Sequence, residues 1–302
     1  MDKINFFKRR SIFRPISLIY ISVFVLITAL LAYRGYDIPP PPVEKPQINY
    51  FADLPLKARA VYVFDSKENR ILFEKNARTP LPLASITKLM TVHCALMNNT
   101  TNNYVTVPDK VYAYNDHATS TGLTEHWKID DLATYTLVAS SNAGAVTLAN
   151  TMGGEDKTVA CMNDEAQKLN LFETKFSNVT GLDIDANTPG AVGSAENVVT
   201  LFQNVYFSAT EIINKTAFEN FNIYSKNGII HKAQNTNIIA EQITGFLGSK
   251  TGLTDIAGGN LTFGMNVGLN HMIFVAILGS TEEGRFSDAL TISDAVTKSF
   301  AN

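Results

Sequence analysis

The sequence predicts an α+β fold in which a mainly helical subdomain is inserted into a β-sheet subdomain. Two β-rich runs, residues 59–65 and 70–74, are separated by the polar tetrapeptide SKEN, as expected for a hairpin. Three further strand-like runs, residues 243–249, 260–267 and 272–279, lie near the other end of the chain. We therefore expect a five-stranded antiparallel sheet that draws strands from both chain ends and is flanked by helices.

The helical pattern lies between these two groups of strands. Apolar residues recur every three or four positions in five segments, at residues 87–98, 130–139, 142–152, 157–169 and 196–207. A last amphipathic segment, residues 287–300, is expected to cover the sheet.

The N-terminal segment has the pattern of a membrane anchor. A basic tail, residues 1–14, precedes an apolar run of 18 residues, 16–33. At 1.5 Å per residue such a helix is about 27 Å long, close to the thickness of the hydrocarbon core. The basic flank predicts a cytoplasmic N-terminus. We expect an uncleaved anchor at residues 15–34, with a cleaved signal peptide as the alternative.

A proline-rich linker, residues 35–49, follows the anchor and contains the sequence IPPPPVEKP, which favours a stiff polyproline II conformation. The globular domain is expected at residues 50–302. Of the 25 Lys/Arg and 28 Asp/Glu in the chain, seven and three lie in residues 1–48, which leaves 18 and 25 and a net charge of −7. Because no basic run lies outside the anchor flank, we expect no nucleic-acid partner.

The first of three motifs pairs a nucleophile with a base. Ser85 and Lys88, in the sequence SITK, stand three residues apart at the start of an amphipathic segment, so a helix would place both side chains on one face. A lysine can act as the base when burial and a second cation lower its pKa. We expect Ser85 to be the nucleophile, Lys88 the base and Lys250 the second cation. Alone, the motif would indicate a helix cap and a solvated lysine.

The second motif is SSN at residues 140–142. Residues two apart on a helix do not share a face, so Ser140 and Asn142 converge only if a turn separates a helix ending near Ala139 from one beginning after Ser141. Ser140 would then relay a proton to the leaving group, and Asn142 would donate to an amide carbonyl of the substrate. A helix cap is the simpler interpretation of the same residues.

The third motif is GSKTGL at residues 248–253, at the end of a strand. Gly252 lacks the Cβ that would keep an extended substrate from pairing alongside. We expect Lys250 and Thr251 to bind a terminal carboxylate, and the N–H groups of Leu253 and Ser85 to form an oxyanion hole. In this order, the three motifs predict a serine acyl-transfer site that needs no histidine.

No cofactor or metal site is expected from the histidines and cysteines. Cys94 and Cys161, the two cysteines of the chain, each lie among apolar residues and are expected to be core thiols. The five histidines have no metal-binding spacing and are expected to be structural or surface residues: His93, His117, His126, His231 and His271.

Residues 58–300 resemble the low-molecular-mass penicillin-binding proteins, the family of D-alanyl-D-alanine carboxypeptidases and endopeptidases. Besides the three motifs, the similarity includes the signature TKFSNVTGL at residues 174–182 and the triplet NTN at 235–237. It implies a β-lactamase/DD-peptidase-like fold and a serine carboxypeptidase that cuts D-Ala-D-Ala-terminated peptidoglycan stem peptides through an acyl-enzyme on Ser85. It also implies covalent inhibition by β-lactams and a catalytic domain outside a bacterial cytoplasmic membrane.

The resemblance makes Arg285, 35 residues after Lys250, a candidate partner of the substrate carboxylate. Thr236 stands where some carboxypeptidases of the family have an arginine, so a DD-endopeptidase acting on cross-links is an alternative. A class A-like β-lactamase would need a glutamate such as Glu173, but the sequence after Glu173 matches the peptidase signature. A peptidoglycan-binding protein without turnover is a further alternative, although binding alone does not require both Ser85 and Lys88.

Overall fold

A computed structural model describes residues 15–34, 49–98, 103–108, 111 and 125–301. The chain divides into two units, residues 1–48 and 49–302. Helix α1 (Pro15–Arg34) belongs to the first unit. The predicted basic tail and residues 35–48 of the predicted linker lie outside the described residues. Within the described part of the chain, no helix is both long and apolar enough to cross a membrane.

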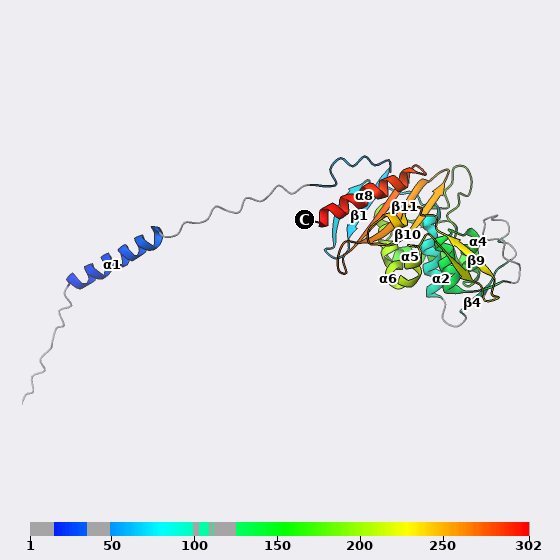
Figure 1. Ribbon diagram of the computed structural model, residues 1–302, viewed down its shortest axis with the longest axis horizontal. Coiled ribbons are helices and arrows are strands. Elements are labelled where there is room, and N and C mark those ends of the chain that lie inside the picture. Colours follow the sequence, from blue (N-terminus) through cyan, green and yellow to red (C-terminus); the bar gives the residue numbers. More distant parts are fainter. Residues whose placement is uncertain (1–14, 35–48, 99–102, 109–110, 112–124, 302) are drawn as a thin grey trace, which may run out of the picture. The chain divides into compact units, whose positions relative to one another are not determined.

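A five-stranded antiparallel sheet forms the centre of the second unit (Figure 1). The strand order is β10-β11-β12-β1-β2, so strands from both chain ends lie side by side, as predicted. Their bounds are β1 (Ala60–Asp65), β2 (Arg70–Lys75), β10 (Phe246–Thr254), β11 (Gly258–Asn266) and β12 (Met272–Ser280). The α+β fold class is confirmed.

Both faces of the sheet are buried, which explains why its central strands are almost continuously apolar. Along β12, Ile273, Val275 and Ile277 pack with helix α8 (Gly284–Phe300) on one face. Phe274, Ala276 and Leu278 lie in the second core on the other face, which helix α6 (Ala195–Ser208) covers. The sheet therefore separates two hydrophobic clusters, one under α8 and one among the inserted helices.

The segment between β2 and β10 is mainly helical, as predicted. Its helices besides α6 are α2 (Lys88–Met97), α3 (Ile129–Val138), α4 (Asn142–Asn150), α5 (Glu155–Lys168) and α7 (Thr210–Lys215). Short strands complete it: β3 (Leu81–Pro82), β4 (Tyr104–Thr106), β5 (His126–Lys128), β6 (Lys175–Phe176), β7 (Ala191–Gly193), β8 (Asn220–Tyr224) and β9 (Ile230–Gln234). The described residues also include the 3₁₀ turns η1 (Ala84–Thr87) and η4 (Ala240–Gln242).

The largest difference from the predicted elements concerns β10. The apolar pattern predicts a strand over residues 243–249, whereas β10 continues through Lys250 to Thr254. The pattern ends early because Ser249, Lys250 and Thr251 are polar yet buried. Helix α7 and the hairpin of β8 and β9 were not predicted, since they are short and lack strong periodicity.

We expect Asp288 to be a main link between α8 and the sheet domain. Its carboxylate, which is 2% exposed, accepts hydrogen bonds from the N–H groups of Lys57 (3.0 Å) and Ala58 (2.8 Å) and from the Ser280 hydroxyl (2.8 Å). Asp288→Ala leaves these donors unpaired and should lower the free energy of unfolding by about 3 kcal/mol.

Urea unfolding of the two variants would measure this loss. The control is Asp294→Ala on the same helix, whose carboxylate forms an exposed ion pair with Lys298 and should contribute less than about 1 kcal/mol. Equal losses in the two variants would contradict the assignment.

Candidate active site

The predicted nucleophile lies on a strained turn. Ser85 is the second residue of η1, immediately before α2, and its side chain is half-buried. Ala84 has a φ of +48°, a left-handed conformation that costs a residue with a Cβ about 1–2 kcal/mol. The chain leading into the turn is fixed by the buried Asn260 of β11, whose Nδ2 donates to the carbonyl oxygen of Pro82 (2.9 Å).

Lys88, the predicted base, is fully buried at the first position of α2. Its Nζ donates to Ser85 Oγ (2.7 Å), Asn142 Oδ1 (2.7 Å) and the carbonyl oxygen of Thr180 (2.9 Å). An ammonium has three donors and no acceptor, so these three partners match the protonated form. Loss of one proton would leave a lone pair directed at the Ser85 hydroxyl.

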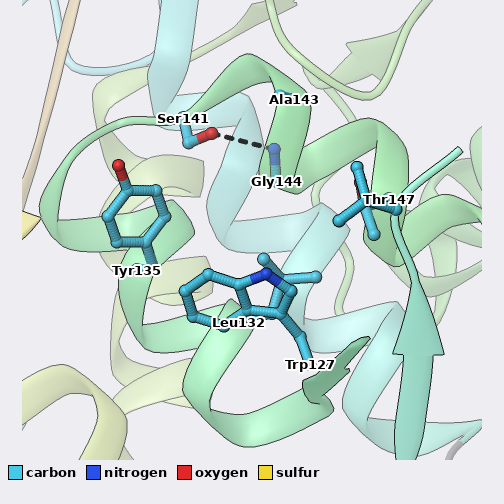
Figure 2. Close-up of a pocket in the computed structure, with 8 residues that line it drawn as sticks. Trp127, Leu132, Tyr135, Ser141, Ala143, Gly144 and Thr147 are labelled. Carbon is cyan, nitrogen blue, oxygen red and sulfur yellow. Dashed lines mark hydrogen bonds between the residues drawn. The ribbon is translucent and has the colours of Figure 1, made fainter. Parts of the chain in front are cut away.

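The break predicted in the second motif is present. Helix α3 ends at Val138, α4 begins at Asn142, and Ser140 between them has a φ of +56°. Figure 2 shows the hydroxyl of Ser141 accepting a hydrogen bond from the N–H of Gly144 (2.8 Å), which caps α4. The two adjacent serines therefore have separate roles, because only Ser140 faces the third motif.

Behind this turn the helices are tightly packed. A cavity of about 10 Å³ remains between Ser141, Gly144 and side chains that include Trp127 and Tyr135 (Figure 2). The space is no larger than one water molecule. The side chains packed around this cavity support the turn, and the cavity itself is too small for a ligand.

Lys250, from β10, lies opposite Lys88. Its Nζ donates to Ser140 Oγ (2.8 Å) and to the carbonyl oxygen of Thr251 (2.9 Å), and the side chain is 1% exposed. Burial lowers the pKa of Lys250 well below its ordinary value, and the positive charges of Lys88 and Arg285 lower it further. The structure thus places Lys88 close enough to Lys250 to weaken the hold of Lys250 on its proton.

The free edge of the sheet is formed by β10. The N–H of Ser249 donates to Thr216 Oγ1 (2.8 Å) and so points away from β11. Since alternate residues of an antiparallel strand share this direction, the N–H groups of Thr251 and Leu253 also face the open edge. This orientation is the one that the predicted role of Leu253 in an oxyanion hole requires.

Gly252 is also needed for packing within the protein. A Cβ at this position would approach the carbonyl oxygen of Leu83 at 2.7 Å and the Cβ of Ala84 at 3.2 Å. The glycine is thus needed for close packing of β10 against the turn that carries Ser85. Its predicted role in leaving room for an extended substrate stays a prediction.

Thr236 and Thr251 share a hydrogen bond of 2.5 Å between their hydroxyl groups. The N–H of Thr236 also donates to the carbonyl oxygen of Val138 (3.2 Å), at the end of α3. Asn237 next to it donates from Nδ2 to Ser249 Oγ (3.0 Å). The NTN triplet therefore connects the second motif with the third.

Arg285, at the start of α8, binds the protein backbone. Its Nη1 donates to the carbonyl oxygen of Gly252 (2.8 Å), and its Cζ lies 4.6 Å from the centre of the Phe286 ring. Burial lowers the pKa of the guanidinium. Its predicted contact with a substrate carboxylate stays a prediction.

Sequence reasoning did not identify Thr180, whose carbonyl oxygen is the third acceptor of Lys88. Asn178 shapes this loop, because its Oδ1 accepts from the N–H of Gly181 (2.7 Å) and its Nδ2 donates to the carbonyl oxygen of Leu182 (2.8 Å). Asn163 of α5 binds Phe176 of β6, the strand that leads into this loop. Its Oδ1 accepts from the N–H of Phe176 (3.0 Å), and its Nδ2 donates to the carbonyl oxygen of Phe176 (2.9 Å). The signature at residues 174–182 indicated that this segment matters, but it did not reveal that the functional group is the backbone carbonyl oxygen of Thr180.

Other candidate residues lie elsewhere. Glu173 Oε2 accepts a hydrogen bond from Asn197 of α6 (3.0 Å). His231 pairs with Glu125 (2.6 Å) and His271 with Asp65 (2.8 Å), which are structural contacts of the kind expected. His117 lies outside the described residues. No group of three or more metal-binding side chains was found among the residues that the structure describes.

Comparison with known sequences gives one consistent family. The family described as D-alanyl-D-alanine carboxypeptidase matches residues 48–281. D-alanyl-D-alanine carboxypeptidase DacF of Bacillus subtilis is 26% identical over 281 residues, which are 89% of this chain and 70% of the relative. DacD of Escherichia coli is 29% identical over 245 residues, which are 75% of this chain and 60% of the relative.

Solved structures show the same fold. A D-alanyl-D-alanine carboxypeptidase from Mycobacterium tuberculosis has a TM-score of 0.72 at 23% identity, covering 80% of this chain and 92% of that one. Penicillin-binding protein D2 from Listeria monocytogenes, in its ampicillin-bound form, has a TM-score of 0.69 at 26% identity, covering 80% of this chain and 98% of that one.

Gly181→Ala tests how the nucleophile turn is supported. Gly181 has a φ of +81°, and a Cβ there would overlap the carbonyl oxygen of Ala84. The turn must shift to accommodate it, and since misplacement by about 1 Å can cost about 100-fold in rate, we expect acylation of Ser85 by an activated ester to slow by about that factor. Intact-mass spectrometry of the acylated protein measures the rate.

Gly228→Ala is the matched control. Its φ of +79° gives similar backbone strain, but a Cβ there meets nothing within 4 Å. This variant should lose about 1–2 kcal/mol of stability and keep its acylation rate. Similar rates for the two alanine variants would show that the Gly181 contact does not position Ser85.

Proposed function

This chain belongs to the D-alanyl-D-alanine carboxypeptidase family, and we propose that it is a serine peptidase that removes the terminal D-alanine from peptidoglycan stem peptides. One observation carries the proposal: a buried lysine holds the hydroxyl of Ser85 at 2.7 Å, and a second buried lysine holds that of Ser140 at 2.8 Å. The proposed nucleophile Ser85 thus contacts its proposed base Lys88, and the proposed relay Ser140 contacts Lys250, with no histidine in either pair.

Acylation begins when neutral Lys88 accepts the proton of Ser85 Oγ. The oxygen attacks the carbonyl carbon of the penultimate D-alanine, and the N–H groups of Ser85 and Leu253 are the proposed donors to the oxyanion. The C–N bond then breaks and leaves an ester on Ser85. The leaving amine takes a proton through Ser140, which Lys250 contacts directly.

Substrate binding uses the open edge of β10. An extended peptide can add to this edge as a further strand, pairing with the outward backbone groups of Thr251 and Leu253. Asn142, whose Oδ1 accepts a hydrogen bond from Lys88, is the proposed donor to a substrate carbonyl. Hydrolysis by water then restores Ser85 and releases the shortened peptide.

Release of D-alanine from a D-Ala-D-Ala-terminated stem pentapeptide is the direct test. Wild-type protein should release it, and Ser85→Ala should not, because the acyl-enzyme cannot form. Ser85→Ala should stay folded, although it removes one of the three acceptors of the buried Lys88 ammonium and should therefore have a somewhat lower melting temperature. Absence of release from wild-type protein that still acylates with penicillin would exclude the carboxypeptidase reaction.

The adjacent serines of the second motif provide a matched pair. Ser140→Ala removes the side-chain acceptor of Lys250 and should lower kcat by about 100-fold or more, with a loss of stability of about 1–3 kcal/mol because a buried donor is left unpaired. Ser141→Ala removes the α4 cap and should lower stability by about 1 kcal/mol while activity is kept. Equal losses of kcat would contradict a relay through Ser140.

DD-endopeptidase activity is the second candidate. In support, a D-alanyl-D-alanine endopeptidase from Haemophilus influenzae is 30% identical over 128 residues, 41% of this chain. Thr236 also pairs with Thr251 through neutral hydroxyls, so this part of the site adds no charge for a terminal carboxylate. A cross-linked muropeptide dimer, assayed beside the pentapeptide, distinguishes the two activities through the product formed.

Covalent inhibition by β-lactams is proposed from the same site. Related Listeria penicillin-binding protein D2 has been seen in ampicillin-bound and cefotaxime-bound forms. In this chain the β-lactam carbonyl would acylate Ser85. Labelling by a fluorescent penicillin should disappear in Ser85→Ala.

We also propose that residues 15–34 anchor the protein in the cytoplasmic membrane with the catalytic domain outside. The 18-residue apolar run and its basic flank support this. The full chain should remain in the membrane fraction after alkaline carbonate washing, and residues 49–302, which form a separate unit, should be soluble. Extraction of the full chain by carbonate would argue against the anchor.

A further inference from the structure

The two cysteines of the chain meet at the contact between two helices. Cys94 on α2 and Cys161 on α5 have their sulfur atoms 2.7 Å apart, and neither is in a disulfide in this structure. A disulfide bond is about 2.05 Å long, so the sulfurs need to move by less than about 1 Å to bond. The sequence suggested two unrelated core thiols, whereas the structure places them against each other.

The two thiols differ in access. Cys94 is fully buried, and burial together with the hydrogen bond to Cys161 raises the pKa of its thiol. Cys161 is half-buried and lines a surface groove of about 350 Å³ with Met97, Met152 and Lys168 among its walls. An external reagent would therefore meet Cys161 first.

We propose that Cys94 and Cys161 form a redox-active pair that an external disulfide converts into a covalent cross-link between α2 and α5. The Cys161 thiolate attacks one sulfur of the donor disulfide, forms a mixed disulfide and releases one donor thiol. Cys94, having lost its proton to solvent, attacks the Cys161 sulfur and releases the second donor thiol. Two protein thiols are oxidised, and one donor disulfide is reduced to two thiols.

The cross-link joins elements that support Lys88. Cys94 lies in the helix that begins at Lys88, and Cys161 lies two residues before Asn163, which holds the loop containing Thr180. The cysteines are 67 residues apart, so a bond between them closes a long loop and restricts the unfolded chain. We expect it to stabilise this part of the site without taking part in the chemistry.

The test incubates the full chain with oxidised glutathione, followed by denaturation, alkylation of free thiols and intact-mass measurement. Untreated protein should take up two alkyl groups. Treated protein should take up none, retain no glutathione and melt about 5–10 °C higher. Two alkyl groups after treatment, a lasting glutathione adduct, or an unchanged melting temperature with the bond formed would each overturn the proposal.

Two variants establish the order of attack. Cys94→Ser should keep a glutathione adduct on Cys161, because the resolving thiol is missing, and Cys161→Ser should form no adduct, since Cys94 is buried. An adduct on Cys94 in the second variant would overturn the assigned order. The measurement on wild-type protein does not depend on whether either variant folds.

Discussion

The active site depends on one buried ammonium group. Removing such a charge from water costs several kcal/mol unless its hydrogens are all bound, and the three acceptors of Lys88 come from η1, α4 and the loop at Thr180. Asn142 and Thr180 lie 54 and 92 residues after Lys88 in the chain. All three acceptors belong to the segment between β2 and β10, so the inserted subdomain supplies every partner of this nitrogen.

Strain is concentrated beside the same residues. Ala84 and Ser140 both adopt left-handed backbone conformations that glycine would adopt more easily. Ala84 precedes the nucleophile Ser85, and Ser140 itself binds Lys250. Gly181 packs against Ala84, and the capped start of α4 supports Ser140. The surrounding structure compensates the cost, so the two hydroxyls are directed before any substrate is present.

The features that could be predicted from the sequence are those that depend on local patterns, whereas features that depend on tertiary contacts could not be predicted. The sheet, the main helices and the break before Asn142 followed from local patterns, because apolar spacing and turn residues reflect local structure. The extent of β10 did not, since its polar residues are buried by the site they form. Thr180 acts through its backbone oxygen, which no side-chain type reveals. The Gly252 contact with Leu83 depends on a tertiary approach between residues 169 positions apart, so the sequence did not reveal that this glycine is also needed for packing.

The open edge of β10 shows how the fold limits what the site can bind. An exposed sheet edge normally invites pairing with another chain along its whole length. Here Thr216 already binds the N–H of Ser249, and Lys250 binds the carbonyl oxygen of Thr251, so pairing with a ligand begins at the Thr251 N–H. Four residues from Thr251 onward complete the strand. A short extended peptide fits this length, and Lys250, one of the two groups that restrict the edge, also binds the relay serine, Ser140.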